Sequence, residues 1–187
     1  AYRDVNIAFA NELSLICDKL DIDVWELIRL ANRHPRVNIL QPGPGVGGHC
    51  IPVDPLYLTW WARQNGGRAK LVETADSINH IMPKYVAQRA LELVDSSVVK
   101  PKVLILGVAY KPGVGDVRET PVSELRDHLK AHGAEVAWHD PLVKNWEGSD
   151  PVDTDWNCDV AILATKQIGM DLSHLISGGI QILDCTN

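Results

Sequence analysis

The segment Pro42–Pro55, with the sequence PGPGVGGHCIPVDP, restricts the fold of this chain more than any other stretch. Its first seven residues include four glycines and two prolines, which excludes a helix interior or a central strand there. The loop leads to the thiol of Cys50, with the carboxylate of Asp54 close behind it. One interpretation is a stiff loop that presents a nucleophile to a substrate held by peptide N–H groups. The other, a connector whose cysteine is buried, stays open at this point.

Composition narrows the class of protein. The 187 residues suit one large domain or two small ones, and a hydrophobic content of 45% supplies a normal core. The formal net charge of -6 argues against a nucleic-acid partner. No apolar run approaches the roughly 20 residues that a membrane span needs, so we expect no membrane partner.

The four cysteines are widely spaced and include no CxxC pair, which argues against a zinc site and a disulfide scaffold. We therefore predict no metal and a reducing, cytoplasmic setting. Cys17, Cys158 and Cys185 lie in apolar helix or strand patterns and are expected to be small core residues. Only Cys50 lies in a loop.

The first half of the chain has the apolar periodicity of helices. An apolar face of the first helix is formed by Val5, Phe9, Leu13, Ile16 and Leu20. A second helix is predicted from Asp23, with Glu26 as its capping-box partner, and ends before His34–Pro35. Further helices are expected over residues 56–62, from about Lys70 to Ile81, and from Pro83 to about Val94.

The period changes after a polar hinge at residues 96–102. Val103–Ala109 is apolar on both faces, as is typical of a parallel strand covered on both sides. A helix capped by Thr120 follows, and then strands at residues 135–139, 159–164 and 180–185. This alternation predicts an α/β chain, with an all-helical central domain (residues 1–98) followed by a Rossmann-like, doubly wound parallel sheet domain (residues 99–187).

Two basic segments are candidate anion sites. The loop Tyr110–Glu119 follows the first strand, where doubly wound folds bind ligands, but it contains no GxGxxG fingerprint of NAD. Its Lys111 and Arg118 suit a phosphate, or they pair with neighbouring carboxylates on the surface. The segment Arg33–Arg36 is either an anion-binding rim or a solvated helix C-terminus.

Four stretches together resemble the UDP-glucose/GDP-mannose dehydrogenase family. They are Gly47–Pro55 (GGHCIPVDP), Phe9–Glu12 (FANE), Leu106–Lys111 (LGVAYK) and Asp116–Pro121 (DVRETP). The likeness covers nearly the whole chain, and the cysteine loop is highly specific. The run Arg33–Leu40 followed by Pro42–Gly45 is most similar to 6-dehydrogenases of UDP-N-acetyl-D-mannosamine. Pro52 and Tyr57–Trp60 are closer to those of UDP-N-acetyl-D-glucosamine, so the epimer stays open.

The resemblance implies an NAD-dependent oxidation of the sugar C6 alcohol to a carboxylate by two hydride transfers. Cys50 would attack the intermediate aldehyde to form a thiohemiacetal and then a thioester, and Asp54 would orient or deprotonate groups at that centre. The residues implied to bind the nucleotide sugar are Arg3, His34, Arg36, Gly47, Tyr110 and Lys111. Arg118 matches a position that contacts NAD.

The resemblance also implies a homodimer through the helical domain, in which Tyr110 and Lys111 reach the shared active site from a partner subunit. The family begins with an NAD-binding domain that this sequence does not contain, and the chain lacks an initiator methionine. We therefore expect a fragment of a cytoplasmic enzyme that is inactive by itself. The alternatives are a 6-dehydrogenase of UDP-N-acetyl-D-glucosamine or UDP-glucose, and a non-catalytic module for nucleotide-sugar binding or dimerisation.

Overall fold

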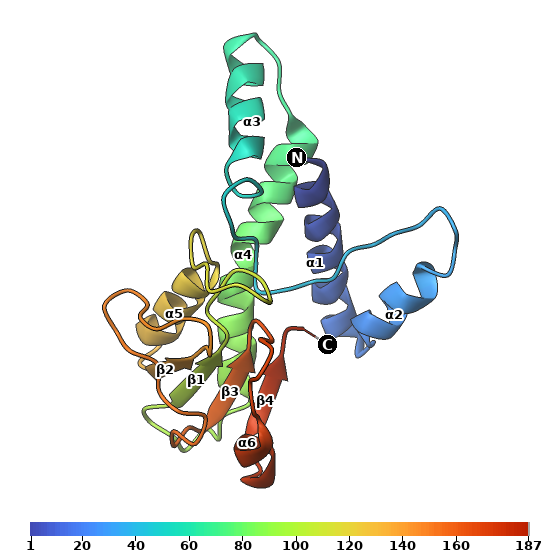
Figure 1. Cartoon of the computed structure of the whole chain (residues 1–187). Coiled ribbons are helices and arrows are strands. Elements are labelled where there is room, and N and C mark those ends of the chain that lie inside the picture. Colours follow the sequence, from blue (N-terminus) through green and yellow to red (C-terminus); the bar gives the residue numbers. More distant parts are fainter. Residues whose placement is uncertain (187) are drawn as a thin grey trace.

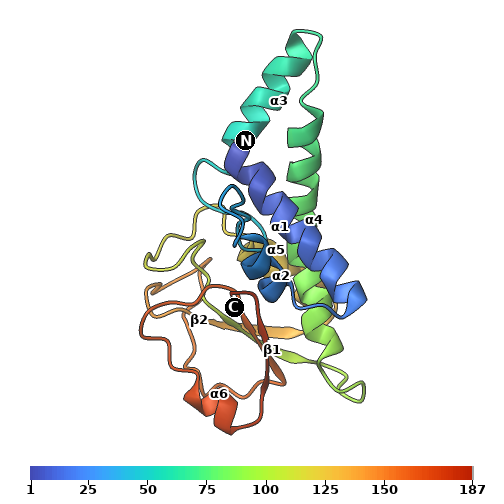
Figure 2. The same cartoon turned by 90° about the vertical axis from the view of Figure 1, so that its right-hand side faces the viewer.

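The computed structural model describes residues 1–186 and combines a helical half with a parallel sheet. Helix α1 (Tyr2–Leu20) runs alongside the long helix α4 (Lys70–Glu92), and the shorter α2 (Val24–Ala31) branches away from them (Figure 1). Helix α3 (Asp54–Gln64) and the first turns of α4 form a hairpin that projects from the molecule. The sheet lies around the other end of α4 (Figures 1 and 2).

Helix α1 buries a different side from its most hydrophobic one. Its buried residues are Asp4, Ala8, Ala10, Asn11 and Cys17, and these small or polar side chains allow close approach to α4. On the periodic apolar face, Phe9, Ile16 and Leu20 are 47%, 49% and 62% exposed. The sequence therefore predicted this helix correctly, but among the described residues much of its apolar stripe is left uncovered.

Helix α4 is continuous, whereas the sequence predicted two helices separated near Pro83. Proline lacks an N–H, so the carbonyl of Asn79 has no partner four residues further along. Burial compensates for the lost bond, because Pro83 and its helix neighbours Met82, Val86 and Ala87 are all buried. The prediction failed because tertiary packing outweighs the local cost of an internal proline.

The sheet is wholly parallel, with the strand order β2-β1-β3-β4. Its strands are β1 (Lys102–Leu106), β2 (Glu135–His139), β3 (Val160–Leu163) and β4 (Gln181–Asp184). Helices α5 (Val122–Ala131) and α6 (Ser173–Ser177) complete the second half. The predicted parallel α/β architecture is confirmed, and the first strand ends three residues early because Gly107 adopts φ 82°.

Alternate side chains of the central strands enter two separate cores. Val103 and Ile105 pack with α5 and with the last turns of α4, whereas Leu104 and Leu106 pack with Leu175 of α6. Both faces are thus covered, which explains why the central strands are continuously apolar. Because α4 shares a core with the sheet, it connects the helical half rigidly to the second half. No helix of the described residues is long and apolar enough to cross a membrane.

Candidate active site

The glycine loop before Cys50 lies directly on the loop that follows β1. A Cβ atom on Gly47 would lie 2.7 Å from the carbonyl oxygen of Glu119, and one on Gly48 would lie 2.8 Å from the ring of Tyr110. The N–H of Gly48 donates a hydrogen bond of 3.1 Å to the carbonyl of Arg118. Gly48 also has φ 91°, a conformation that side chains disfavour. Glycine is therefore required here for close approach between the two halves of the chain.

Cys50 is exposed at the end of this loop. Its Sγ lies 3.9 Å from Nδ1 of His49. Its carbonyl accepts a hydrogen bond of 2.9 Å from the N–H of Asp54, the exposed first residue of α3. This single turn keeps the thiol and the carboxylate in one short segment. The exposed sulfur contradicts the interpretation of a connector with a buried cysteine.

The loop after β1 places cations beside the glycine loop. Nζ of Lys111 lies 5.2 Å from the ring centroid of Tyr110, the ring that covers Gly48. Arg118 forms a two-pronged ion pair with Asp116, with a shortest distance of 2.6 Å. This guanidinium lowers the pKa of the Asp116 carboxyl to about 2. The surface pairing considered for Arg118 is thus present, whereas Lys111 contacts an aromatic ring.

The resemblance implied that Tyr110 reaches the site from a partner subunit. In the structure Tyr110 contacts the glycine loop of its own chain, with the ring against Gly48 and its Cβ close to Gly47. A single chain therefore brings Tyr110 to its own cysteine loop, and contact of Tyr110 with the site of a partner subunit stays a prediction. The physical reason for the contact within one chain is the close glycine contact between residues 45–48 and the Tyr110–Pro121 segment.

The remaining predicted residues fall into two groups. The start of α1, which carries Arg3, lies beside the start of α3, which carries Asp54 (Figures 1 and 2). His34 and Arg36 lie in the exposed loop after α2, at the outer edge of the molecule in Figure 1. In Figure 1 this loop reaches to the right of α1, whereas the segment that leads into α3 lies to the left of α1.

A buried polar network, which sequence reasoning missed, supports the start of the glycine loop. Asn11 donates to Oδ1 of Asn79 (2.9 Å), and Asn79 donates to Oδ1 of Asp4 (2.7 Å). The Oδ1 atom of Asn11 accepts from the N–H of Gly43 (2.9 Å). Burial raises the pKa of Asp4, whose Oδ2 has no hydrogen-bond partner among the described residues. The available signal was Asn11, an amide in an otherwise small and apolar pattern.

The turn after β1 does not fit the pyrophosphate of NAD. The N–H groups of Val108 and Ala109, which would face a phosphate in a dinucleotide-binding sheet, both donate to Oδ2 of Asp140 at 2.9 and 3.1 Å. The Asp140 side chain is 2% exposed, so its carboxylate fills the anion position from inside. This agrees with the missing GxGxxG fingerprint.

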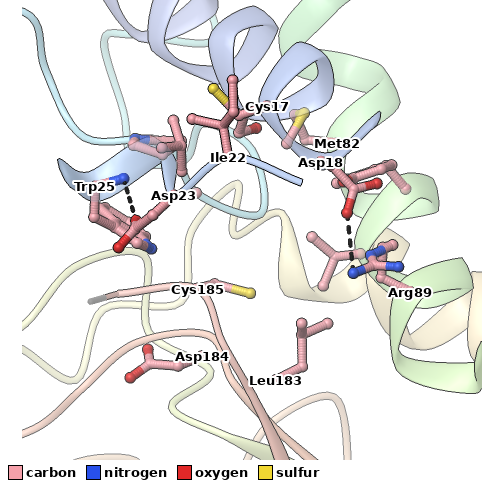
Figure 3. A pocket seen from close by; sticks show the side chains of 16 residues that line it. Cys17, Asp18, Ile22, Asp23, Trp25, Met82, Arg89, Leu183, Asp184 and Cys185 are labelled. Atoms are coloured by element: carbon pink, nitrogen blue, oxygen red, sulfur yellow. Dashed lines mark hydrogen bonds and ion pairs between the residues drawn. The ribbon is translucent and has the colours of Figure 1, made fainter. Parts of the chain in front are cut away.

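Two of the cavities in the described chain are lined in part by residues 42–52, and none of the predicted site residues lines either of these two. One, of about 310 Å³, lies between the cysteine loop, α4 and Glu119–Glu124. The other, of about 280 Å³, lies between α1, α2, α4 and the end of β4 (Figure 3). Asp18 and Arg89 form an ion pair of 3.0 Å at its wall. Burial raises the pKa of Cys185 there to about 12, so this thiol is unsuited to nucleophilic work.

Comparison with known proteins supports a single family. Residues 1–81 match the central domain of the UDP-glucose/GDP-mannose dehydrogenase family, and residues 104–170 match its UDP binding domain. The UDP-N-acetyl-D-mannosamine dehydrogenase of Campylobacter jejuni is 52% identical over 145 residues, which cover 77% of this chain and 35% of that protein. The enzyme of the same name from Salmonella typhi is 42% identical over 183 residues, or 93% of this chain and 43% of that protein.

Solved structures agree with these sequence relationships. A UDP-D-ManNAc dehydrogenase from Pyrococcus horikoshii matches 100% of this chain with a TM-score of 0.86 at 34% identity, over 46% of its own length. The UDP-N-acetyl-mannosamine dehydrogenase of Staphylococcus aureus matches 100% of this chain with a TM-score of 0.82 at 36% identity, over 45% of its own length. The chain thus spans less than half the length of these relatives. It belongs to the UDP-glucose/GDP-mannose dehydrogenase family, whose central and UDP-binding domains it contains.

Proposed function

We propose that this chain is the part of an NAD-dependent nucleotide-sugar 6-dehydrogenase that carries the nucleophile and binds the substrate. The proposed substrate is UDP-N-acetyl-D-mannosamine, which is oxidised to its uronate. The observation that carries the proposal is the exposed Cys50 thiol at the end of a glycine loop, beside a loop with Tyr110 and Lys111. Membership of the family supports the reaction class, and the names of the similar proteins support the mannosamine epimer.

In the proposed mechanism, the Cys50 thiolate adds to the C6 aldehyde carbon of the oxidised sugar. A C–S bond forms, the carbonyl electron pair moves to oxygen, and this oxygen takes a proton to give a thiohemiacetal. After oxidation to the thioester, water adds to the acyl carbon and the C–S bond breaks, which returns the thiolate and releases the carboxylate. Thiolates are strong nucleophiles, and a nearby base such as Asp54 assists the proton transfers.

The nucleotide half of the substrate is assigned to the loop after β1. Lys111 lies over the Tyr110 ring, which contacts Gly48 of the glycine loop; Lys111 provides a cation for the diphosphate, and Tyr110 provides a ring surface. We assign further sugar and phosphate contacts to Gly47, which lies against Glu119 and Tyr110, and to Arg3 in the first turn of α1. We assign His34 and Arg36, which lie in the exposed loop after α2, to the corresponding site of a second subunit.

NAD, the cofactor that the resemblance implies, would accept the two hydrides. The turn after β1 is filled by Asp140, so the proposal places NAD outside the sheet of this chain. Arg118 is the candidate for contact with NAD at the edge of this sheet. To make that contact, its guanidinium would exchange the ion pair with Asp116 for one with the cofactor. We therefore expect no NADH from this chain alone with UDP-N-acetyl-D-mannosamine and NAD⁺. We also propose a reducing, cytoplasmic setting, in keeping with four free thiols.

Alkylation of the thiols tests the proposal. With iodoacetamide and peptide mass spectrometry, we expect Cys50 to react at least about tenfold faster than the buried Cys17 and Cys158, which serve as internal controls. UDP-N-acetyl-D-mannosamine should slow the modification of Cys50 alone. A rate at Cys50 that the nucleotide sugar leaves unchanged would contradict a substrate site at this loop, and equal protection by the glucosamine epimer would count against the assigned sugar.

A further inference from the structure

The loop of residues 110–116 is exposed, but buried side chains hold its backbone from beneath. Lys111 and Gly113 are open to solvent, whereas Gln167 and Asp140 are only 3% and 2% exposed. Burying an amide and a carboxylate is costly unless their polar atoms are hydrogen-bonded. The partners that satisfy these two side chains lie in the loop, in the turn that leads into it, and in the segment beneath it. Nothing in the sequence pattern marks Gln167 as part of a site.

The side chain of Gln167 forms hydrogen bonds to two adjacent residues of the loop. Its Oε1 accepts a hydrogen bond of 2.8 Å from the N–H of Gly113, and its Nε2 donates one of 2.9 Å to the carbonyl of Val114. The same Nε2 lies 3.4 Å from Oδ2 of Asp140. Because both ends of the amide are used, the side chain has one favourable orientation and holds the loop in a defined position.

The Asp140 carboxylate accepts hydrogen bonds from the turn that leads into the loop and from the segment beneath the loop. Its Oδ2 accepts from the N–H groups of Val108 and Ala109, and its Oδ1 accepts from the N–H of Leu142 at 3.0 Å. The loop lies on this last segment, since a Cβ on Gly115 would lie 2.3 Å from the carbonyl oxygen of Leu142. Asp140 thereby connects the strand end, the loop and the segment beneath the loop.

We propose that Gln167 and Asp140 are positioning residues, which hold loop 110–116 in the shape that binds the diphosphate of the nucleotide sugar. This inference rests on the proposed function of Lys111. A loop that is already ordered loses less conformational freedom when a ligand binds, and its affinity is correspondingly higher. An internal carboxylate at the turn also excludes a ligand phosphate from that position, so the diphosphate binds at the loop.

The test compares Gln167→Met with the unchanged chain. Methionine has a similar length and lacks both hydrogen-bonding groups, so it releases Gly113 and Val114 without a large cavity. We expect the dissociation constant for UDP, measured by calorimetry, to rise by about tenfold. The melting temperature should fall by less than about 5 °C, because Gly113 is exposed and Val114 only partly buried, so water can bind the released groups. Ser149→Ala, which removes a hydrogen bond to Trp138 in the same half of the chain, is the control and should leave UDP affinity unchanged.

Amide hydrogen exchange separates the inference from the proposed function. In the unchanged chain the Gly113 amide should exchange slowly without any ligand, although Gly113 is exposed, and Gln167→Met should accelerate exchange only in residues 110–116. Rapid exchange at Gly113 in the unchanged chain would overturn the inference, even if the variant fails to fold. A lower melting temperature with unaltered UDP affinity would overturn it too. Absence of UDP binding by the unchanged chain would refute the proposed function. Slow exchange at Gly113 would still support the inference that Gln167 and Asp140 hold the loop in position.

Discussion

Gly47 and Gly48 are the residues at which the cysteine loop lies directly on the loop after β1. Between them they contact Tyr110 and Glu119 at distances that leave no room for a Cβ atom. The cysteine loop can therefore pack on the loop after β1 only because these two residues have no side chain. Many glycines in this chain lie in open turns, so the role of these two follows from contact and not from composition.

Replacement of Gly47 by alanine tests this contact. The added Cβ would meet the Glu119 carbonyl oxygen at 2.7 Å, so the loops must separate. We expect the free energy of unfolding in urea to fall by about 1–3 kcal/mol and UDP affinity to weaken. Gly43→Ala is the matched control from the same loop, because nothing lies within 4 Å of its added Cβ. Equal stability of the two variants would show that the loops are not packed in solution.

The pairing of Asp116 with Arg118 makes a prediction about pH. The guanidinium lowers the pKa of the Asp116 carboxyl to about 2 in the folded chain. Stability from this pair is therefore present above the ordinary pKa of an aspartate and is lost as the pH falls through about 2. Titration followed by carbon NMR should show Asp116 still ionised near pH 3, and Arg118→Ala should return its pKa towards the usual range. Titration of Asp116 near pH 4 in the unchanged chain would contradict the pairing.

Among the elements, α1 and α4 meet through polar groups where most helix pairs meet through hydrocarbon. Asn79 of α4 contacts Asp4 and Asn11 of α1, and all three are almost fully buried. Oδ1 of Asn11 also accepts a hydrogen bond from the N–H of Gly43, so the network extends to the start of the glycine loop. The helix pair thereby specifies both its own register and the anchor point of the loop.

Asn79→Ala should destabilise the chain by about 2–3 kcal/mol, because it leaves buried polar atoms of Asp4 and Asn11 without partners. Unfolding in urea provides the measurement. The matched control is Asn6→Ala on the exposed side of α1, where the amide bonds only to the carbonyl of Tyr2; a change within about 0.5 kcal/mol is expected there. If both variants lost equally little stability, the network would not contribute to the fold.

For the whole molecule, the most informative feature is an apolar surface on the helical half. Helix α3 exposes Tyr57, Trp60 and Trp61, and α1 exposes its periodic apolar face. Large contiguous apolar patches on a folded chain indicate an interface. We propose that these helices form a homodimer, which would also bring His34 and Arg36 of one chain towards the site of the other.

Sedimentation equilibrium at micromolar concentration tests the dimer. The unchanged chain should be dimeric, and Trp60→Glu should shift it to monomer, because a charge replaces a side chain that is 56% exposed in the single chain. Ile168→Glu is the control, since Ile168 is 84% exposed but lies in the sheet half. A monomeric unchanged chain would refute the dimer, and dissociation by Ile168→Glu alone would move the interface to the sheet half.

Local patterns were sufficient wherever a segment is determined by its own residues. The doubly apolar run at residues 103–109 and the strand pattern at residues 159–164 predicted strands of a parallel sheet, which the structure has at Lys102–Leu106 and Val160–Leu163. Asp23 does cap α2 through the N–H groups of Trp25 and Glu26. Prediction failed at Pro83, where buried neighbours maintain one helix. It also missed Asn79, whose side-chain partners lie 68 and 75 residues away in sequence, and Gln167, whose partners lie 27 to 54 residues away.

The amino-acid sequence by itself determined the class of the chain: helices followed by a parallel sheet, and a glycine and proline loop that carries a thiol and a carboxylate. These features depend on backbone freedom and side-chain periodicity, which are local properties. Only the tertiary structure decided that Cys50 is exposed, that Tyr110 covers the glycine loop of its own chain, and that Asp140 fills the turn after β1. Those outcomes depend on the packing of distant segments, and a contact between distant segments has no local signature.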